Sequence, residues 1–155
     1  TRKTTPCLRD LEKYAVRCGG GENHRRDLSC MALIKENHIA SAGGIARAVR
    51  MVRNDLGRKR FIEVETQNLK EVKEALICNV NRIMFDNMTL PQAIKAVALV
   101  DGKAETEVSG NINLNNVRSF AKTGVNYISI GSLTHSPPAV DISLIIENQT
   151  NRKLV

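Results

Sequence analysis

Four short segments with the residue pattern of β-strands recur at nearly constant spacing along most of this chain, and this regularity is the strongest constraint on its fold. They are centred on Val64, Phe85, Glu107 and Ile130, at intervals of 21, 22 and 23 residues. Each interval has room for one strand, one helix and two short loops. Strands that alternate with helices through short connections form a parallel sheet, so the spacing predicts an α/β protein.

Hydrophobic periodicity and turn residues place the expected elements. Strands are predicted at residues 31–34, 61–65, 83–85, 104–108, 127–130 and 142–146, and helices at 8–17, 41–56, 68–77, 90–99 and 114–123. Thr89 is the expected N-cap of helix 90–99, with Pro91 in the first turn. So many repeats without the glycine fingerprint of a dinucleotide-binding fold favour a barrel. We predict an incomplete, open β/α barrel of parallel strands over residues 1–140, followed by a C-terminal strand and tail over residues 141–155.

Length and composition limit the classes of protein that this chain can represent. It has 155 residues, of which 42% are hydrophobic and 25% charged, as in globular proteins with a sizeable core. Its apolar runs all fall short of the roughly 20 residues that a membrane span needs, and no signal-peptide pattern opens the chain. We expect a cytoplasmic protein without a membrane partner. The four cysteines form no Cys-x-x-Cys pair and are expected to be reduced, mostly buried thiols.

Positive charge is concentrated in the first 60 residues. They contain 14 Lys and Arg against 6 Asp and Glu, whereas the whole chain has a net charge of +7. A basic region of this kind indicates a solvated surface or an anionic partner. With three Phe, two Tyr and no Trp, the chain has little on which to stack bases, so a small polyanion is favoured over nucleic acid.

Polar residues lie at or just past the carboxyl ends of the predicted strands. They are Lys35, Glu65, Asp86, Ser109 and Gly131, together with Lys3 in the β-prone segment that opens the chain. In a β/α barrel these ends meet at one mouth, where the βα loops open. Polar ends are also what any strand needs at a surface. Two lysines and two carboxylates around one mouth nevertheless favour a binding site over ordinary strand ends.

A series of short motifs runs through the chain from Thr1 to about Leu144. They are Thr1-Arg-Lys-Thr-Thr-Pro6, Gly19-Gly-Gly-Glu-Asn-His-Arg25, Leu33-Ile-Lys-Glu-Asn-His38, Glu63-Val-Glu65, Ile83-Met-Phe-Asp-Asn87, Glu107-Val-Ser-Gly-Asn111, Gly124-Val-Asn-Tyr-Ile-Ser-Ile-Gly-Ser-Leu-Thr-His135 and Asp141-Ile-Ser-Leu144. In order and spacing, this series resembles the quinolinate phosphoribosyltransferase family, specifically its C-terminal barrel domain.

The resemblance implies an enzyme of NAD biosynthesis. Members of the family transfer phosphoribose from phosphoribosyl pyrophosphate to quinolinate and release pyrophosphate and CO₂, giving nicotinate mononucleotide. The resemblance also implies a Mg²⁺ cofactor and a homodimer or higher oligomer. Family members carry an upstream α/β sandwich domain and the start of the barrel, which this chain is expected to lack, so the isolated chain is expected to turn over little substrate.

Each expected role comes from the position that matches the family motif. Arg2, His24, Arg25 and Lys35 would hold the two carboxylates of quinolinate. Lys3, Glu65 and Asp86 would be the catalytic residues, with Glu65 and Asp86 also facing the ribose hydroxyls and the metal. The residues expected to line the phosphate end of phosphoribosyl pyrophosphate are Ser109, Gly110, Asn111, Gly131 and His135.

Several interpretations remain open from the sequence. One rival is a barrel phosphoribosyltransferase that acts on nicotinate without decarboxylation; another is a truncated barrel that serves only in binding or assembly. Glu63 is expected to point away from Glu65 and to lie outside the site. Cys7 stands where the family usually has glycine, which would strain the turn after Pro6 if its φ angle is positive.

Overall fold

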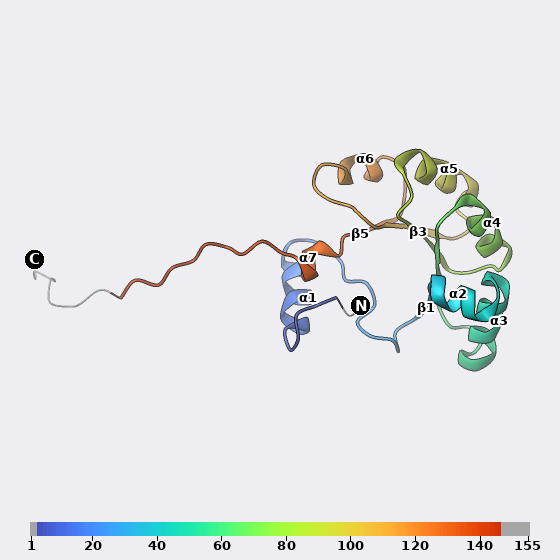
Figure 1. Ribbon diagram of the computed structural model, residues 1–155, viewed down its shortest axis with the longest axis horizontal. Helices are drawn as coiled ribbons and strands as arrows, with labels where there is room; N and C mark the ends of the chain where they lie inside the picture. Colours follow the sequence, from blue (N-terminus) through green and yellow to red (C-terminus); the bar gives the residue numbers. More distant parts are fainter. Residues whose placement is uncertain (1–2, 147–155) are drawn as a thin grey trace, which may run out of the picture.

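Five parallel strands form one sheet in the computed structural model, which describes residues 3–146 (Figure 1). The strands are β1 (Ala32–Ile34), β2 (Ile62–Thr66), β3 (Arg82–Asp86), β4 (Glu105–Ser109) and β5 (Tyr127–Ser129). They lie side by side in sequence order, and every neighbouring pair is parallel. The first and last strands of this sheet do not pair with each other, which confirms the predicted open barrel of parallel strands.

Five helices cover one side of the sheet. They are α2 (Glu36–Ala42), α3 (Ile45–Leu56), α4 (Leu69–Ile77), α5 (Leu90–Val100) and α6 (Val117–Ala121). Figure 1 shows them in an arc around the outside of the strands. On the other side, α1 (Arg9–Cys18) packs next to the short helix α7 (Ser132–His135), although the two are far apart in sequence.

The strand pleat gives the sheet two faces of opposite character, because successive side chains point to opposite sides. The outer face, toward the helices, is apolar. Its buried residues include Ile34, Ile62, Val64, Ile83, Phe85 and Val108. The inner face is mostly charged or polar, with Lys35, Glu63, Glu65, Arg82, Glu107 and Ser109 among its residues. Helix packing therefore stabilises one face and leaves the other for ionic chemistry.

Local signals set most helix boundaries. Asn68 caps α4, because its side-chain oxygen accepts hydrogen bonds from the backbone N–H groups of Lys70 and Glu71. Thr89 is the N-cap of α5, as predicted, and Pro91 lies in the first turn. The backbone N–H of Thr89 donates a hydrogen bond to Gln92 Oε1 at 2.8 Å.

Two helix predictions need correction. The helix expected over residues 41–56 is two helices, because Gly43 and Gly44 have φ angles of 77° and 130° and break the backbone between α2 and α3. The helix expected over 114–123 is confined to α6, and Asn116 occupies its N-cap position. Helix α7 was not predicted, since four residues carry too little periodicity to show.

The strand predicted at residues 142–146 is wrong. The segment from 137 to 146 contains no helix or strand and runs away from the sheet (Figure 1). Its apolar side chains are exposed, Leu144 by 89%. An apolar segment becomes a strand only where a neighbouring strand supplies hydrogen-bond partners, and none does so within residues 3–146.

The cysteines also differ from expectation. All four are free thiols, but Cys7, Cys18 and Cys30 are exposed and Cys78 is half-buried, so the expected burial is wrong. Cys7 has a φ angle of 65°, which confirms the expected strain in the turn after Pro6.

Between residues 3 and 146, no helix is both long enough and apolar enough to cross a membrane.

Candidate functional site

The carboxyl ends of the strands bring several predicted site residues to one rim on the inner face. Lys35 directly follows β1, and its Nζ atom lies 2.9 Å from Glu65 Oε2 on β2. Asp86 ends β3 and is level with Ser109, which ends β4 and is in turn level with Ser129 on β5. Parallel pairing in register therefore places one cation and two carboxylates along the same edge.

The loops after β3 and β4 are joined by side-chain amides. Asn87 Nδ2 donates to Asp86 Oδ2 at 2.8 Å, and Asn111 Nδ2 donates to Asn87 Oδ1 at 3.0 Å. Gly110 has a φ angle of 90°, and a Cβ at this position would collide with Asn87 Oδ1. Only glycine fits without displacing this amide, so Gly110 and Asn111 are structurally tied to Asp86.

The far side of the rim is formed by α7 and the start of the chain. Gly131 precedes α7, and Thr134 Oγ1 donates to the backbone oxygen of Lys3 at 2.8 Å. His135 lies at the end of the same helix, with Nδ1 2.7 Å from Ser136 Oγ. Lys3 is thus attached to the element that follows β5, although 131 residues separate the bonded pair.

His24 and Arg25 come from the loop between α1 and β1. His24 Nε2 lies 3.0 Å from Glu63 Oε2 and 3.8 Å from Glu107 Oε1. Arg25 Nη1 donates to the backbone oxygen of Met31 at 3.0 Å, at the entrance to β1. The loop therefore places His24 against the inner face of β2 and β4.

An ionic network fills the inner face below the rim. Arg82 Nη1 donates to Glu107 Oε2 at 3.0 Å, while its Nε and Nη2 atoms donate to Glu105 Oε2 at 2.9 and 2.8 Å. Its guanidinium carbon lies 4.0 Å from the centre of the Tyr127 ring, a stacking distance. Ser129 Oγ donates to Glu107 Oε1. Arg82 thus pairs with two carboxylates, of which Glu107 is buried and Glu105 is partly exposed.

Burial and neighbouring charge change the acidity of this network. Desolvation, followed by the negative charge of Glu63, raises the pKa of Glu107, while Ser129, His24 and Arg82 act in the opposite direction. Desolvation alone would lower the pKa of Arg82, but its hydrogen bond to Glu105 and the nearby carboxylates raise it above the usual value. Arg82 therefore remains a cation in this setting.

Three groups in the network have the composition of a metal site. One ligand atom from each of His24, Glu63 and Glu107 lies within 4.8 Å of the others. However, Arg82 already places a positive charge 3.0 Å from Glu107 Oε2, and His24 is hydrogen-bonded to Glu63. These contacts satisfy part of the cluster, while Glu63 Oε1 has no hydrogen-bond partner among the described residues.

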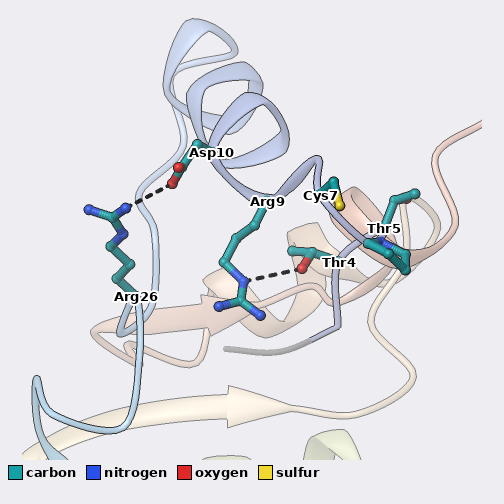
Figure 2. A pocket seen from close by; sticks show the side chains of 7 residues that line it. Thr4, Thr5, Cys7, Arg9, Asp10 and Arg26 are labelled. Atoms are coloured by element: carbon teal, nitrogen blue, oxygen red, sulfur yellow. Dashed lines mark hydrogen bonds and ion pairs between the residues drawn. The ribbon is translucent and has the colours of Figure 1, made fainter.

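A separate pocket of about 490 Å³ lies between the start of α1 and the loop that carries Arg26 (Figure 2). Arg26 and Asp10 point toward each other and are 3.2 Å apart, and Arg9 Nε donates to Thr4 Oγ1 at 3.4 Å. Lys35, Glu65 and Asp86 do not line this pocket. This pocket is therefore distinct from the rim, and Arg9 and Arg26 add two cations to its lining.

One prediction about orientation is wrong. Glu63 and Glu65 are two residues apart on β2, and side chains at that separation point to the same face. Both lie on the inner face, with Glu63 bonded to His24 and Glu65 paired with Lys35. The two-residue alternation of strand side chains predicts this orientation. Applied to β3 and β4, the same rule places Arg82, Glu105 and Glu107 on the inner face as well.

The structure brings together Lys35, Glu65, Asp86, Ser109, Gly110 and Asn111 along the rim, with Gly131, His135 and the Lys3 backbone beside β5. His24 and Arg25 lie toward β1 and β2. Arg2 lies outside the described residues. The ligand roles of all these residues remain predictions.

Comparison with known proteins identifies relatives over nearly the whole chain. Residues 1–145 match the sequence profile described as "Quinolinate phosphoribosyl transferase, C-terminal domain". A chloroplastic nicotinate-nucleotide pyrophosphorylase (carboxylating) of Oryza sativa subsp. japonica is 45% identical over 167 residues, covering 96% of this chain and 45% of that protein. A probable nicotinate-nucleotide pyrophosphorylase (carboxylating) of Bacillus subtilis is 48% identical over 145 residues, covering 93% of this chain and 50% of the relative.

Solved structures agree. The nicotinate-nucleotide pyrophosphorylase of Ehrlichia chaffeensis superposes with a TM-score of 0.84 at 50% identity, over 88% of this chain and 49% of that one. The Francisella tularensis protein of the same name gives 0.86 at 48% identity, over 92% and 51%. A thiamine phosphate pyrophosphorylase from Pyrococcus furiosus, at 16% identity and a TM-score of 0.55, shares the fold alone. The chain spans about half the length of the curated relatives it matches.

Proposed function

Because this chain belongs to the quinolinate phosphoribosyltransferase family, we propose that it carries the family's reaction centre. The reaction would transfer phosphoribose from phosphoribosyl pyrophosphate to quinolinate, with loss of CO₂, to give nicotinate mononucleotide and pyrophosphate. One observation carries the proposal: Lys35 pairs with Glu65 at the same strand-end rim to which Asp86 and Ser109 belong. Lys35, a cation suited to a carboxylate of quinolinate, thus lies on the same rim as Glu65 and Asp86, whose negative charge suits a positively charged sugar.

The acidic pyridine would be held from the β1 side. Quinolinate has two carboxylates on one ring, and the guanidinium of Arg25, the imidazole of His24 and the ammonium of Lys35 are suitable partners. Arg2 would add a fourth contact. Because Lys35 already pairs with Glu65 at 2.9 Å, an arriving carboxylate would share the lysine with Glu65.

Bond formation would take place between the pyridine and the sugar. The ring nitrogen donates its electron pair to the anomeric carbon as the bond to pyrophosphate breaks, and the sugar acquires oxocarbenium character. Negative charge from Glu65 and Asp86 stabilises that developing positive charge. Lys3 would attract the departing pyrophosphate, and Ser109, Gly110, Asn111, Gly131 and His135 would bind the phosphate groups.

Decarboxylation needs little further from the protein. When the carbon–carboxylate bond breaks, its electron pair stays on a ring carbon next to the new cationic nitrogen, which stabilises it. A proton from water then replaces CO₂ on that carbon. The task of the residues is to hold the ring in one orientation through both steps.

The proposed Mg²⁺ fits the donor set. Glu65 Oε2 is buried and has no hydrogen-bond partner among the described residues apart from its ion pair with Lys35, and Asp86 supplies a second carboxylate on the next strand. Oxygen ligands of this type suit Mg²⁺. When bound, the ion would supply charge neutralisation for pyrophosphate.

Assembly is a further part of the proposal. Leu11 and Tyr14 on α1 are 65% and 58% exposed, and the apolar residues of 140–146 are also uncovered. Exposed apolar groups of this size are typical of surfaces that another subunit or domain covers, which supports a homodimer or higher oligomer. Sedimentation velocity would test this. The cytoplasmic location remains a prediction, since relatives from plants are named as chloroplastic or mitochondrial.

The test of function is competition and turnover. We expect quinolinate to bind and nicotinate to compete poorly, because a one-acid pyridine leaves part of the cationic group unpaired. Release of labelled CO₂ from quinolinate should require phosphoribosyl pyrophosphate, and should be slow because the chain is half the length of its relatives. Equal binding of the two pyridines would favour the rival without decarboxylation.

A further inference from the structure

Glu63 is the most completely buried acid of the inner face, and its burial needs an explanation. Its exposed fraction is 0%, yet only one of its oxygens has a partner. Oε2 lies 3.0 Å from His24 Nε2, whereas Oε1 has no hydrogen-bond partner among the described residues. Burying a half-satisfied carboxylate is unfavourable for folding. Stability alone therefore does not account for a glutamate here.

The hydrogen bond to Glu63 determines how His24 presents its ring. An ionised carboxylate can only accept hydrogen bonds, so it requires a hydrogen on Nε2. A histidine whose one nitrogen is held in this way presents the other to its surroundings. Within residues 3–146 no group is bonded to His24 Nδ1, and 20% of the His24 side chain is exposed, so the ring is not fully enclosed.

The surroundings make this arrangement rigid. Glu107 Oε1 lies 3.8 Å from His24 Nε2, and Glu107 is itself held by Arg82 on one oxygen and Ser129 on the other. His24 Nε2 thus faces two inner-face carboxylates, one from β2 and one from β4, the strands on either side of β3. Rotation of the imidazole by half a turn would break its bond to Glu63.

We propose that Glu63 is a positioning residue that fixes the His24 imidazole, with Nδ1 turned toward the carboxylate of an acidic pyridine. When that ligand binds, Nδ1 must donate a hydrogen, so the ring binds as the imidazolium, having taken one proton from solvent. Glu63 supplies the balancing negative charge on the opposite side of the ring. The proposal rests on the proposed function, since the ligand is quinolinate.

The first test observes the ring directly. In the full chain labelled with ¹⁵N-histidine, His24 should show hydrogen on Nε2 and a bare Nδ1, and saturating quinolinate should move Nδ1 to its protonated shift. In Glu63→Gln the preference for Nε2–H should weaken, because an amide can donate to this nitrogen as well as accept from it. A matched control is Glu105→Gln, which removes an inner-face carboxylate that bonds Arg82 and not His24. It should leave the His24 spectrum unchanged.

The second test measures affinity by calorimetry. Glu63→Gln should raise the Kd for quinolinate about tenfold, the effect of weakening one hydrogen bond to a charged group, and change the Kd for phosphoribosyl pyrophosphate less than about twofold. In a His24→Ala background, Glu63→Gln should have no further effect on quinolinate, since the histidine through which it acts is gone. Should the Gln variant not fold, Glu63→Asp, which keeps the charge but shortens the reach, should show the same loss.

Opposite results have distinct meanings. A tenfold loss that persists in the His24→Ala background, or a parent ring with hydrogen on Nδ1 alone, overturns the positioning role. Failure of quinolinate to bind the parent chain, with Nε2–H still observed, overturns the proposed function and with it the ligand assigned to Nδ1.

Discussion

The two faces of the sheet are made by alternate residues of the same strands, yet they follow different physical rules. On the outer face, Val64 and Phe85 are fully buried against apolar helix residues. On the inner face, Glu63 and Glu65, which flank Val64 on β2, contact His24 and Lys35 respectively. The outer face gains stability from each apolar contact independently, whereas the inner face depends on complete pairing. The difference shows that residues that stabilise the fold alternate, along the same strand, with residues that are available for chemistry.

Phe85→Ala should cause the largest loss. The ring is fully buried in the outer core, and its removal leaves a cavity, so the free energy of unfolding should fall by about 3–5 kcal/mol. Urea unfolding followed by circular dichroism measures it. Met51→Ala on α3 is the control, because Met51 is 57% exposed and should change stability by less than about 0.5 kcal/mol. Similar losses in the two variants would contradict the outer-face assignment.

Arg82→Met should destabilise by about 3 kcal/mol, because Glu107 would stay buried without its cation. The inner face differs from the outer in that this loss is reversible by a second change. Combining Arg82→Met with Glu107→Gln removes both charges and should recover more than half of the lost stability in the same urea titration. A double variant that is no more stable than Arg82→Met alone would show that packing, and not pairing, dominates this face.

The effect of Glu107→Gln on the free energy of unfolding should depend on pH, unlike the effect of a substitution on the outer face. The pKa of Glu107 is raised by burial from its usual 4.5, so the folded state holds a proton that the unfolded state has lost. The parent therefore loses stability as pH rises from 4.5 through the raised pKa, and the Gln variant does not. Urea unfolding of both proteins at several pH values should give a difference that grows over that window and then levels off. A difference independent of pH would refute the assignment.

Lys35→Ala should have the smallest effect on folding. Half of the lysine side chain is exposed, so losing its pair with Glu65 should cost less than about 1 kcal/mol of stability. Its effect on binding should be larger, a loss of roughly 2–5 kcal/mol for quinolinate if the bound charge pair is desolvated. Calorimetric titration measures this. Unchanged quinolinate affinity would remove Lys35 from the site.

Much of the architecture could be predicted from local patterns. The regular spacing of Val64, Phe85, Glu107 and Ile130 predicted parallel strands, and Thr89 with Pro91 marked the start of α5 correctly. The strand prediction at 142–146 is wrong, because the apolar pattern of this segment is the same whether or not a neighbouring strand is present to pair with it. The double glycine at 43 and 44 was read as part of a helix, although two consecutive glycines with positive φ end one.

The rim was predicted more completely than the network below it. Lys35, Glu65 and Asp86 stand at strand ends, so their positions along the chain indicated their place. Glu63 lies inside β2 and Arg82 begins β3, and the number and identity of their partners depend on which strands are neighbours. His24 shows this most clearly, since its partner Glu63 is 39 residues away.

The sequence by itself determined the order of strands and helices, the apolar outer face and the family, because periodicity, spacing and short motifs are properties of neighbours along the chain. Only the tertiary structure decided which charges meet: His24 with Glu63, Arg82 with Glu105 and Glu107, and the start of the chain with α7. The physical reason is that an ion pair is set by distances of about 3 Å between atoms. Such distances between segments far apart in sequence are defined only once the sheet has curved and its strands are in register.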